Sequence, residues 1–348
     1  MQIKDIIQTL EAIAPSVYQE SYDNAGLIVG DAQASCTGVL TCLDSTEAVI
    51  EEAIRKNCNL VVAHHPIVFK GLKSITGKTY VERVILKAIQ NHIAIYAIHT
   101  NLDNVYSQGV NGRIADQLGL QKQQILAPKA TLKSLTVYVP IAEADALKLA
   151  LQSIGANVQS DVSSLRNVAL GTFPDADGST AQIALHAIFS ASQQGAIKRQ
   201  LSAYSSLNYT IHTIENSNHQ VGSGMIGELP EAMNEKDFLA HIKKSLETST
   251  IKHTALCKKK VKKVALCGGS GGFLLQRAIG ANADFFITSD YKYHEFFDAD
   301  GKIVIADVGH FESEQFTINL LSEIIREKFG NFAVHCTDVN TNPVQYYN

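Results

Sequence analysis

The chain has 348 residues, of which 45% are hydrophobic and 18% charged, a composition typical of a globular protein long enough for two domains. Its 30 lysines and arginines against 34 aspartates and glutamates give a net charge of −4, which offers no electrostatic attraction to nucleic acid or to an anionic membrane. It has no uninterrupted apolar run of about 18 residues, so no membrane span is expected, and its scattered cysteines favour a reduced, cytoplasmic protein.

In the first third of the chain, apolar spacing predicts helices and strands in alternation. The expected helices cover residues 3–13, 47–56 and 80–90, and the expected strands cover residues 38–44, 60–63 and 93–98. A repeated strand–helix order is typical of a mostly parallel sheet with helices on both faces. Residues 1–127 are therefore predicted to form the first half of an α/β core domain.

The pattern changes after residue 127. Strands are expected at 133–140, 181–189 and 208–214, with helices at 142–153 and 194–201. This order suggests a small ferredoxin-like α+β domain, inserted at residues 128–253. The first pattern returns in residues 254–348, the second half of the core. Strands are expected there at 261–267, 285–288 and 303–307, and helices at 273–279 and 312–329.

Two adjacent histidines, His64 and His65, follow the expected strand at 60–63. Pro66 lacks a backbone donor and cannot continue a central strand, so the histidines fall where the strand becomes a loop. In an open α/β sheet this is the usual position for ligand-binding side chains. Because the backbone can turn there, both imidazoles can face one cleft, which suits two neighbouring metal ions better than one.

Two further strand ends carry a histidine and a carboxylate four residues apart. His310 and Glu314 follow the strand at 303–307 and would project from one face of a helix, where they can hold one metal. Alternatively, Glu314 complements the helix dipole while His310 caps the helix. His99 and Asp103 follow the strand at 93–98, although turn formation alone also explains Asp103. Since parallel strands end at one edge of a sheet, the three sites together predict a shared metal centre.

The run Gly268–Gly272 joins a strand to a helix, which is the position of a phosphate-binding loop. It lacks the Gly-Lys-Ser/Thr sequence of a P-loop and the order GxGxxG of a dinucleotide fold. A tight turn with helix-start amides facing the cleft is the alternative.

Seven segments of the chain resemble the family of GTP cyclohydrolase 1 type 2 homologues, also called the NIF-three-like family. The similar segments are YDNAGLIVGD (22–31), CLDSTEAVIEEA (42–53), AHHPIVFKGLKSITG (63–77), HTNLDN (99–104), CGGSGGFLLQRA (267–278), TSDYKYHEFFDADG (288–301) and DVGHFESE (307–314). The middle region is similar to the PII/CutA-like insert of the longer members.

The resemblance implies a dinuclear metal centre in the α/β core. One divalent ion would take His64 and Asp103, the other would take His65 and His310, and Glu314 would bridge both. Mixed imidazole and carboxylate ligands suit Zn, Fe, Mn, Ni or Co, and the sequence does not choose among them.

The resemblance also suggests catalytic or orienting roles for side chains beside the ligands. His99, Asp290 and His294 are expected to orient the ligands or to carry protons, and for His294 an ordinary loop histidine is the alternative. Tyr291 and Tyr293 could stack on a flat substrate or pack in the interior.

For the assembly and the activity, the resemblance implies a toroidal homohexamer and a metal-dependent hydrolase. Its substrate would be a nucleotide-like or other small molecule, and the family name suggests ring opening of GTP with release of formate. A non-catalytic metal-binding, metal-delivery or regulatory assembly is the alternative, and phosphoester cleavage is a related hydrolytic reaction.

Overall fold

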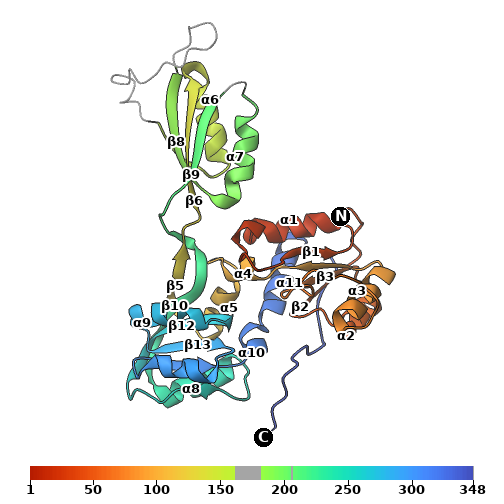
Figure 1. Cartoon of the computed structure of the whole chain (residues 1–348), viewed down its shortest axis with the longest axis vertical. Coiled ribbons are helices and arrows are strands. Elements are labelled where there is room, and N and C mark those ends of the chain that lie inside the picture. The colour runs from red at the N-terminus through yellow and green to blue at the C-terminus, as the bar shows by residue number, and fades with distance from the viewer. Residues whose placement is uncertain (161–181, 205–206, 348) are drawn as a thin grey trace. The chain divides into compact units, whose positions relative to one another are not determined.

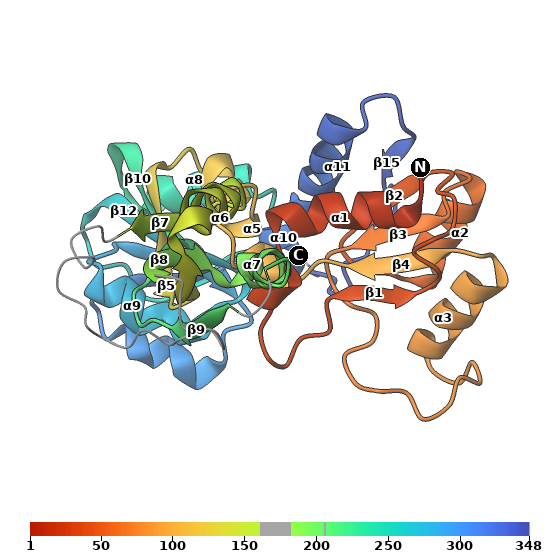
Figure 2. The same cartoon turned by 90° about the horizontal axis from the view of Figure 1, so that it is seen from above.

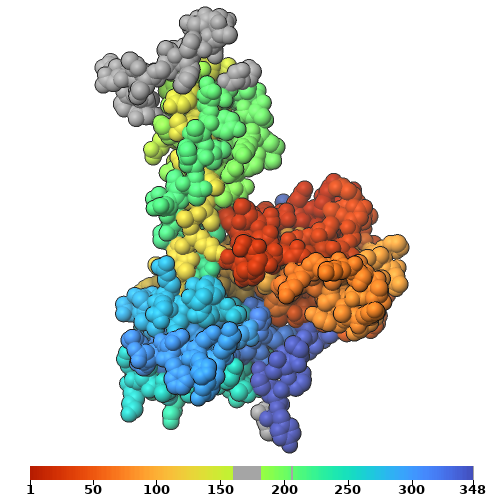
Figure 3. Space-filling view, in the orientation of Figure 1, coloured from red at the N-terminus to blue at the C-terminus, as the bar shows by residue number. Residues whose placement is uncertain are grey.

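The computed structural model describes residues 1–160, 182–204 and 207–347, which form two compact units (Figure 1). The first unit combines Met1–Pro128 with His219–Asn348, and the second is Lys129–Asn218. Segments from the two ends of the sequence, red to orange and blue in Figure 3, thus share the first unit. The second unit is shorter than the predicted insert, because strand β10 (Asn218–Asn234) pairs with β12 (Lys260–Ser270) of the first unit.

A five-stranded sheet in the first unit has the strand order β1-β4-β3-β2-β15. Its members are β1 (Gly26–Val29), β2 (Val39–Cys42), β3 (Leu60–Ala63), β4 (Ala94–Ala97) and β15 (Val334–Cys336). The last four run parallel, while β1 is antiparallel to β4. Every residue of β2, β3 and β4 is buried, which agrees with their short, continuous apolar sequences.

Helices cover both faces of this sheet (Figure 2). On one face α1 (Ile3–Ile13) and α11 (Thr317–Lys328) bury Ile6, Leu10 and Leu321 against Val62. On the other face α2 (Glu47–Arg55) and α3 (Tyr80–Gln90) pack against the strand side chains that point away from α1 and α11. Because successive side chains of a strand point to opposite faces, each strand contributes side chains to two separate cores.

A second, six-stranded sheet in the same unit has the order β11-β14-β13-β12-β10-β5. Its remaining strands are β5 (Gln121–Lys129), β11 (Lys252–His253), β13 (Phe285–Ser289) and β14 (Val304–Asp307). Strands β12, β13 and β14 are parallel, whereas β10 and β11 pair antiparallel with their neighbours. The expectation of a mostly parallel sheet thus holds for the five-stranded sheet, but the α/β core contains a second sheet with antiparallel strands, so both sheets are mixed.

Short helices connect these strands. They are η1 (Ser16–Tyr18), α4 (Thr100–Asp103), α5 (Val110–Gln117), α8 (Glu235–Ser245), η4 (Gly272–Leu274), α9 (Leu275–Gly280), η5 (Tyr293–Ala299) and α10 (His310–Glu314). The single helix expected at 312–329 is two helices, because a turn at Gln315 and Phe316 separates α10 from α11. Across the described residues, every helix is too short or too polar to cross a lipid bilayer.

The second unit is a four-stranded antiparallel sheet with the order β7-β8-β6-β9. Its elements are β6 (Leu132–Pro140), α6 (Ile141–Ser153), β7 (Asn157–Ser160), β8 (Gln182–Ser190), η3 (Ala191–Gln193), α7 (Gln194–Leu201) and β9 (Asn208–Thr213). Residue 181, where a strand was expected to begin, lies outside the described residues. Leu135 and Leu185 of the sheet and Leu147 and Ile197 of the helices form a core of its own.

Candidate metal centre

The first side of the site lies at the carboxyl end of the five-stranded sheet. His64 and His65 follow β3 directly, and Asp103 is the last residue of α4, which follows β4. Because β3 and β4 are parallel neighbours, these side chains reach the same edge. The ring centroids of His64 and His65 are 4.9 Å apart, so the turn after the strand brings both imidazoles to one side.

The second side of the site comes from α10, which follows β14 of the six-stranded sheet. His310 begins this helix and Glu314 ends it, and His310 Nε2 lies 3.1 Å from Glu314 Oε2. Glu314 therefore cannot complement the positive end of the helix dipole, and Gly309 rather than His310 occupies the N-cap position. A role of Glu314 at the helix dipole and of His310 as the helix cap therefore does not explain this pair.

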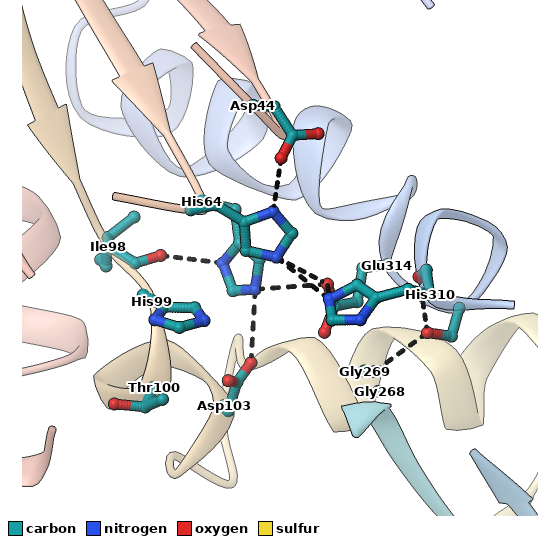
Figure 4. Close-up of polar contacts among 12 residues, drawn as sticks. Asp44, His64, Ile98, His99, Thr100, Asp103, Gly268, Gly269, His310 and Glu314 are labelled. Atoms are coloured by element: carbon teal, nitrogen blue, oxygen red, sulfur yellow. Dashed lines mark hydrogen bonds and ion pairs between the residues drawn. The ribbon is translucent and has the colours of Figure 1, made fainter. Parts of the chain in front are cut away.

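Glu314 stands at the centre of the cluster and its side chain is only 3% exposed (Figure 4). Its Oε2 atom lies 3.0 Å from His65 Nε2 and 3.9 Å from His64 Nε2. Among the described residues, three groups have ligand atoms close enough together to hold a metal ion. They are His64, Asp103 and Glu314; His65, His310 and Glu314; and His64, His65 and His99.

The Nε2 atom of His64 has a lone pair that can bind a metal ion. Its Nδ1–H donates a hydrogen bond to the carbonyl oxygen of Ile98 at 2.8 Å, which leaves Nε2 of the neutral ring with its lone pair. That atom is buried without a hydrogen-bond partner and lies 3.6 Å from Asp103 Oδ1, which is also buried and unpartnered. Two acceptors facing each other are unfavourable unless a cation lies between them, so the residues present fit a metal ion.

The other two histidines are oriented in the same way by carboxylates. His65 Nδ1 lies 2.8 Å from Asp44 Oδ1, and His310 Nδ1 lies 2.6 Å from Asp290 Oδ2. A carboxylate on Nδ1 fixes the ring and directs Nε2 toward the cluster, as in many metal sites.

Burial and neighbouring charges shift the titration of the cluster. Burial lowers the pKa of His64 to about 3, so this ring is neutral. For His65 and His310 burial acts in the same direction but is outweighed by their hydrogen bonds to carboxylates, which raise the pKa values to about 9 and about 11. Burial, reinforced by the charge of Glu314, raises the pKa of Asp103, whereas hydrogen bonds from His310 and His65 outweigh burial and lower that of Glu314.

The glycines at the end of β12 make room for the central carboxylate. A Cβ atom on Gly269 would stand 2.5 Å from Glu314 Oε1, and the backbone there has a φ of +60°. A Cβ atom on Gly268 would first meet Ile114 Cδ1, at 2.9 Å, and would lie 3.3 Å from Glu314 Cγ. A larger residue at 269 would displace the carboxylate, which gives Gly269 a role in the site that requires no phosphate.

The structure places the three further predicted residues differently. His99 lies beside the cluster, with its ring centroid 5.3 Å from those of His64 and His65, and Asp290 holds His310. His294 is exposed on η5, where its ring contacts Tyr293. The structure thus brings together all five predicted ligands and two of the three residues expected beside them, but not His294.

Three groups that orient the histidines are not among the residues predicted from the sequence. They are Asp44, the carbonyl of Ile98, and Asp23, whose Oδ1 lies 2.8 Å from His99 Nδ1. Asp44 ends the strand expected at 38–44, a position that could have suggested it. Asp23 is 76 residues from its partner, and no spacing rule connects them.

Comparisons with known proteins find relatives that match nearly the whole chain. Residues 1–343 match the family model of Duf34/NIF3 (NGG1p interacting factor 3). A curated Bacillus subtilis protein named GTP cyclohydrolase 1 type 2 homolog is 31% identical, over 99% of this chain and 98% of its own length. A Halalkalibacterium halodurans protein of the same name is also 31% identical, over 98% of both chains.

Solved structures of two bacterial proteins resemble the whole chain. A Bacillus cereus protein related to NIF3 is 29% identical with a TM-score of 0.82, covering 100% of this chain and 99% of its own. A Staphylococcus aureus protein is 28% identical with a TM-score of 0.81 and the same coverage. The likeness extends over both compact units.

Proposed function

The chain belongs to the Duf34/NIF3 family, and we propose that it binds two divalent metal ions and hydrolyses a small molecule with metal-activated water. The observation that carries this proposal is the position of Glu314, whose Oε2 is within 3.1 Å of both His65 and His310 and 3.9 Å from His64. A carboxylate shared by two ligand groups is suited to holding two ions side by side.

The ligands divide into two sets around that carboxylate. His64 and Asp103 hold one ion, His65 and His310 hold the other, and Glu314 contributes to both. Support comes from the unpartnered Nε2 and Oδ1 atoms of the first set and from the oriented rings of the second. Imidazole and carboxylate donors suit Zn, Fe, Mn, Ni or Co.

The chemistry divides between the ions and the surrounding side chains. Two neighbouring divalent ions lower the pKa of water and stabilise developing negative charge. His99 is the side chain positioned to accept or donate a proton at Nε2, because Asp23 occupies its Nδ1. Asp290 holds the ring of His310 in place. His294, which is exposed, has no part in this mechanism.

The names of the curated relatives support hydrolysis of a nucleotide-like or other small molecule. A second candidate is metal delivery or regulation without turnover. The exposure of His310, whose side chain is 40% accessible, supports it, because a ligand reachable from solvent favours metal exchange.

The second unit and the assembly complete the proposal. The strand order β7-β8-β6-β9 of the second unit supports a ferredoxin-like, PII/CutA-like domain. So does the order of its described elements along the chain: strand, helix, two strands, helix and strand. The toroidal hexamer is proposed from the resemblance alone.

Metal counting tests the proposed centre. The purified chain and the variants Glu314→Ala and Glu312→Gln are saturated with Zn²⁺, dialysed, and analysed for metal per chain. We expect about two ions in the wild type and in Glu312→Gln, whose carboxylate is on the same helix but outside the cluster, and loss of both from Glu314→Ala. A Glu314→Ala protein that still holds two ions would contradict the shared carboxylate.

An unbiased metabolite screen then tests hydrolysis. Incubation of the two-metal protein with a cell extract should consume at least one small molecule, and Glu314→Ala should consume none. Easily transferred metal without any turnover would instead favour metal delivery.

A further inference from the structure

A cavity of about 930 Å³ opens beside the metal ligands, and all the residues that line it belong to the first unit. His65, His99 and Glu314 form part of its wall. This volume is in the range of small-molecule sites. The chemistry of the wall therefore indicates which class of molecule the cavity takes.

Aromatic side chains are concentrated on this wall. Among the described residues of the first unit, five of the eight exposed phenylalanines and tyrosines line the cavity: Tyr22, Phe69, Tyr80, Phe273 and Tyr346. Phe273 is 69% exposed although it is fully apolar. The ring of Phe69 contacts that of His99, with centroids 5.9 Å apart, so aromatic surface extends to the metal ligands. Such walls suit a flat ring that can stack on them.

The charges on the wall disfavour an anion. Its lining residues include seven carboxyl groups and one lysine, namely Glu20, Asp44, Asp103, Asp290, Asp307, Glu312, Glu314 and Lys252. Lys252 is already paired, with its Nζ 2.7 Å from Asp307 Oδ2. Two divalent ions and the paired Lys252 would together offset five of the seven negative charges, which leaves the wall negative. A triphosphate would thus enter an acidic cavity whose described lining residues offer no unpaired lysine or arginine.

The backbone of the glycine run cannot compensate. The amides of Gly268, Gly269 and Gly271 donate to side-chain oxygens of this chain, at 2.9, 3.0 and 2.9 Å. A phosphate loop needs such amides free.

At the starts of two helices near the cavity, one amide is already used. Thr46 accepts a hydrogen bond from an amide at the start of α2, and Thr79 accepts one at the start of α3. Each of these helix starts therefore offers one amide fewer to an anion.

We propose that this cavity takes a flat aromatic molecule without phosphate groups, such as a nucleobase or nucleoside, rather than a nucleoside triphosphate. The inference rests on the proposed function, since it names the substrate class of the same site. Stacking against Phe273 or another aromatic side chain of the wall holds the ring, and the metal ligands His65 and Glu314 line the same cavity.

Calorimetric titration with guanosine and with the Mg²⁺ complex of GTP tests this inference. Both ligands carry the same base, and Mg²⁺ prevents the triphosphate from stripping the bound metal. We expect guanosine to bind at least tenfold more tightly than Mg·GTP. Phe273→Ala should weaken guanosine binding at least fivefold, because it removes a stacking surface.

Phe297→Ala is the matched control. Phe297 is 68% exposed, compared with 69% for Phe273, but it is not among the residues that line the cavity. It should leave guanosine binding unchanged. Equal or tighter binding of Mg·GTP, no measurable binding of guanosine, or equal effects of the two substitutions would overturn the inference.

Counting metal in the same samples separates this inference from the proposed function. A protein that binds guanosine through Phe273 but cannot hold two ions would contradict only the dinuclear centre. A protein with two ions and no preference for guanosine would contradict only the substrate class.

Discussion

Replacing Gly269 by alanine should damage the metal centre while the chain still folds, with a moderate loss of stability. The new Cβ would lie 2.5 Å from Glu314 Oε1, and ordinary contact begins at 3.4 Å, so the carboxylate oxygen must move by about 0.9 Å. Because that oxygen ends a flexible side chain, the movement itself costs little stability. Metal ligation, however, tolerates errors of only about 0.2 Å in ligand distances.

We expect Gly269→Ala to lower the affinity for metal by about 10- to 100-fold, the range seen when the supports of metal ligands are removed. Equilibrium dialysis against graded Zn²⁺ gives this affinity, and urea unfolding of the metal-free protein gives stability. The backbone at Gly269 is left-handed, with a φ of +60°, so alanine there should also lower the free energy of unfolding by about 1–2 kcal/mol.

Gly119→Ala separates the backbone penalty from the displaced ligand. Gly119 has a φ of +69°, and its Cβ position has no atom within 4 Å. The control should lose about the same 1–2 kcal/mol while binding metal normally. Two results would contradict the displacement of Glu314. One is a Gly269→Ala protein that binds two ions as tightly as the wild type, and the other is a Gly119→Ala protein that loses as much metal affinity as Gly269→Ala.

Three other predictions concern the metal ligands. Thr341 Oγ1 donates a hydrogen bond of 2.8 Å to Asp44, which orients His65. Thr341→Val should therefore lower the affinity for the ion held by His65 about tenfold and leave the affinity for the other ion unchanged. An equal loss of affinity for both ions would contradict this. His64→Ala should lose the ion shared with Asp103 and keep the other, so the metal count falls from two per chain to one. Loss of the ion on His65 and His310 instead would reverse the assignment of His64. In metal-free protein, the raised pKa values of His65 and His310 stabilise the fold below about pH 6.5, and this stability should fall as pH rises through about 9, measured by urea unfolding. A flat pH profile between 6.5 and 9 would refute that sign.

The strand-end residues of the site could be predicted because their strands carry strong local signals. Residues 60–63 and 94–97 are short apolar runs, and both are completely buried strands. The rule that parallel strands end at one edge then connects His64, His65 and Asp103. Spacing of four residues puts His310 and Glu314 on one helical face, where the structure has them 3.1 Å apart.

The rest of the fold depends on pairings that no local pattern encodes. β10 contains glycines that interrupt any alternation, and its place beside β12 depends on residues 26 to 41 positions further along the chain. This strand belongs to the core rather than to the predicted insert, and together with β11 it makes the second sheet mixed. The break between α10 and α11 is equally hidden, because apolar spacing continues across Gln315.

The two sheets supply ligands that neither could use alone. The five-stranded sheet brings His64 and Asp103, whose facing acceptor atoms are buried without partners, and α10 of the other sheet brings Glu314, whose carboxylate is also buried. Burying two carboxyl groups this close is unfavourable unless positive charge lies between them. Divalent cations at the proposed centre would supply this positive charge between Asp103 and Glu314. Metal binding should then stabilise the first unit, in proportion to how far the metal concentration exceeds its dissociation constant.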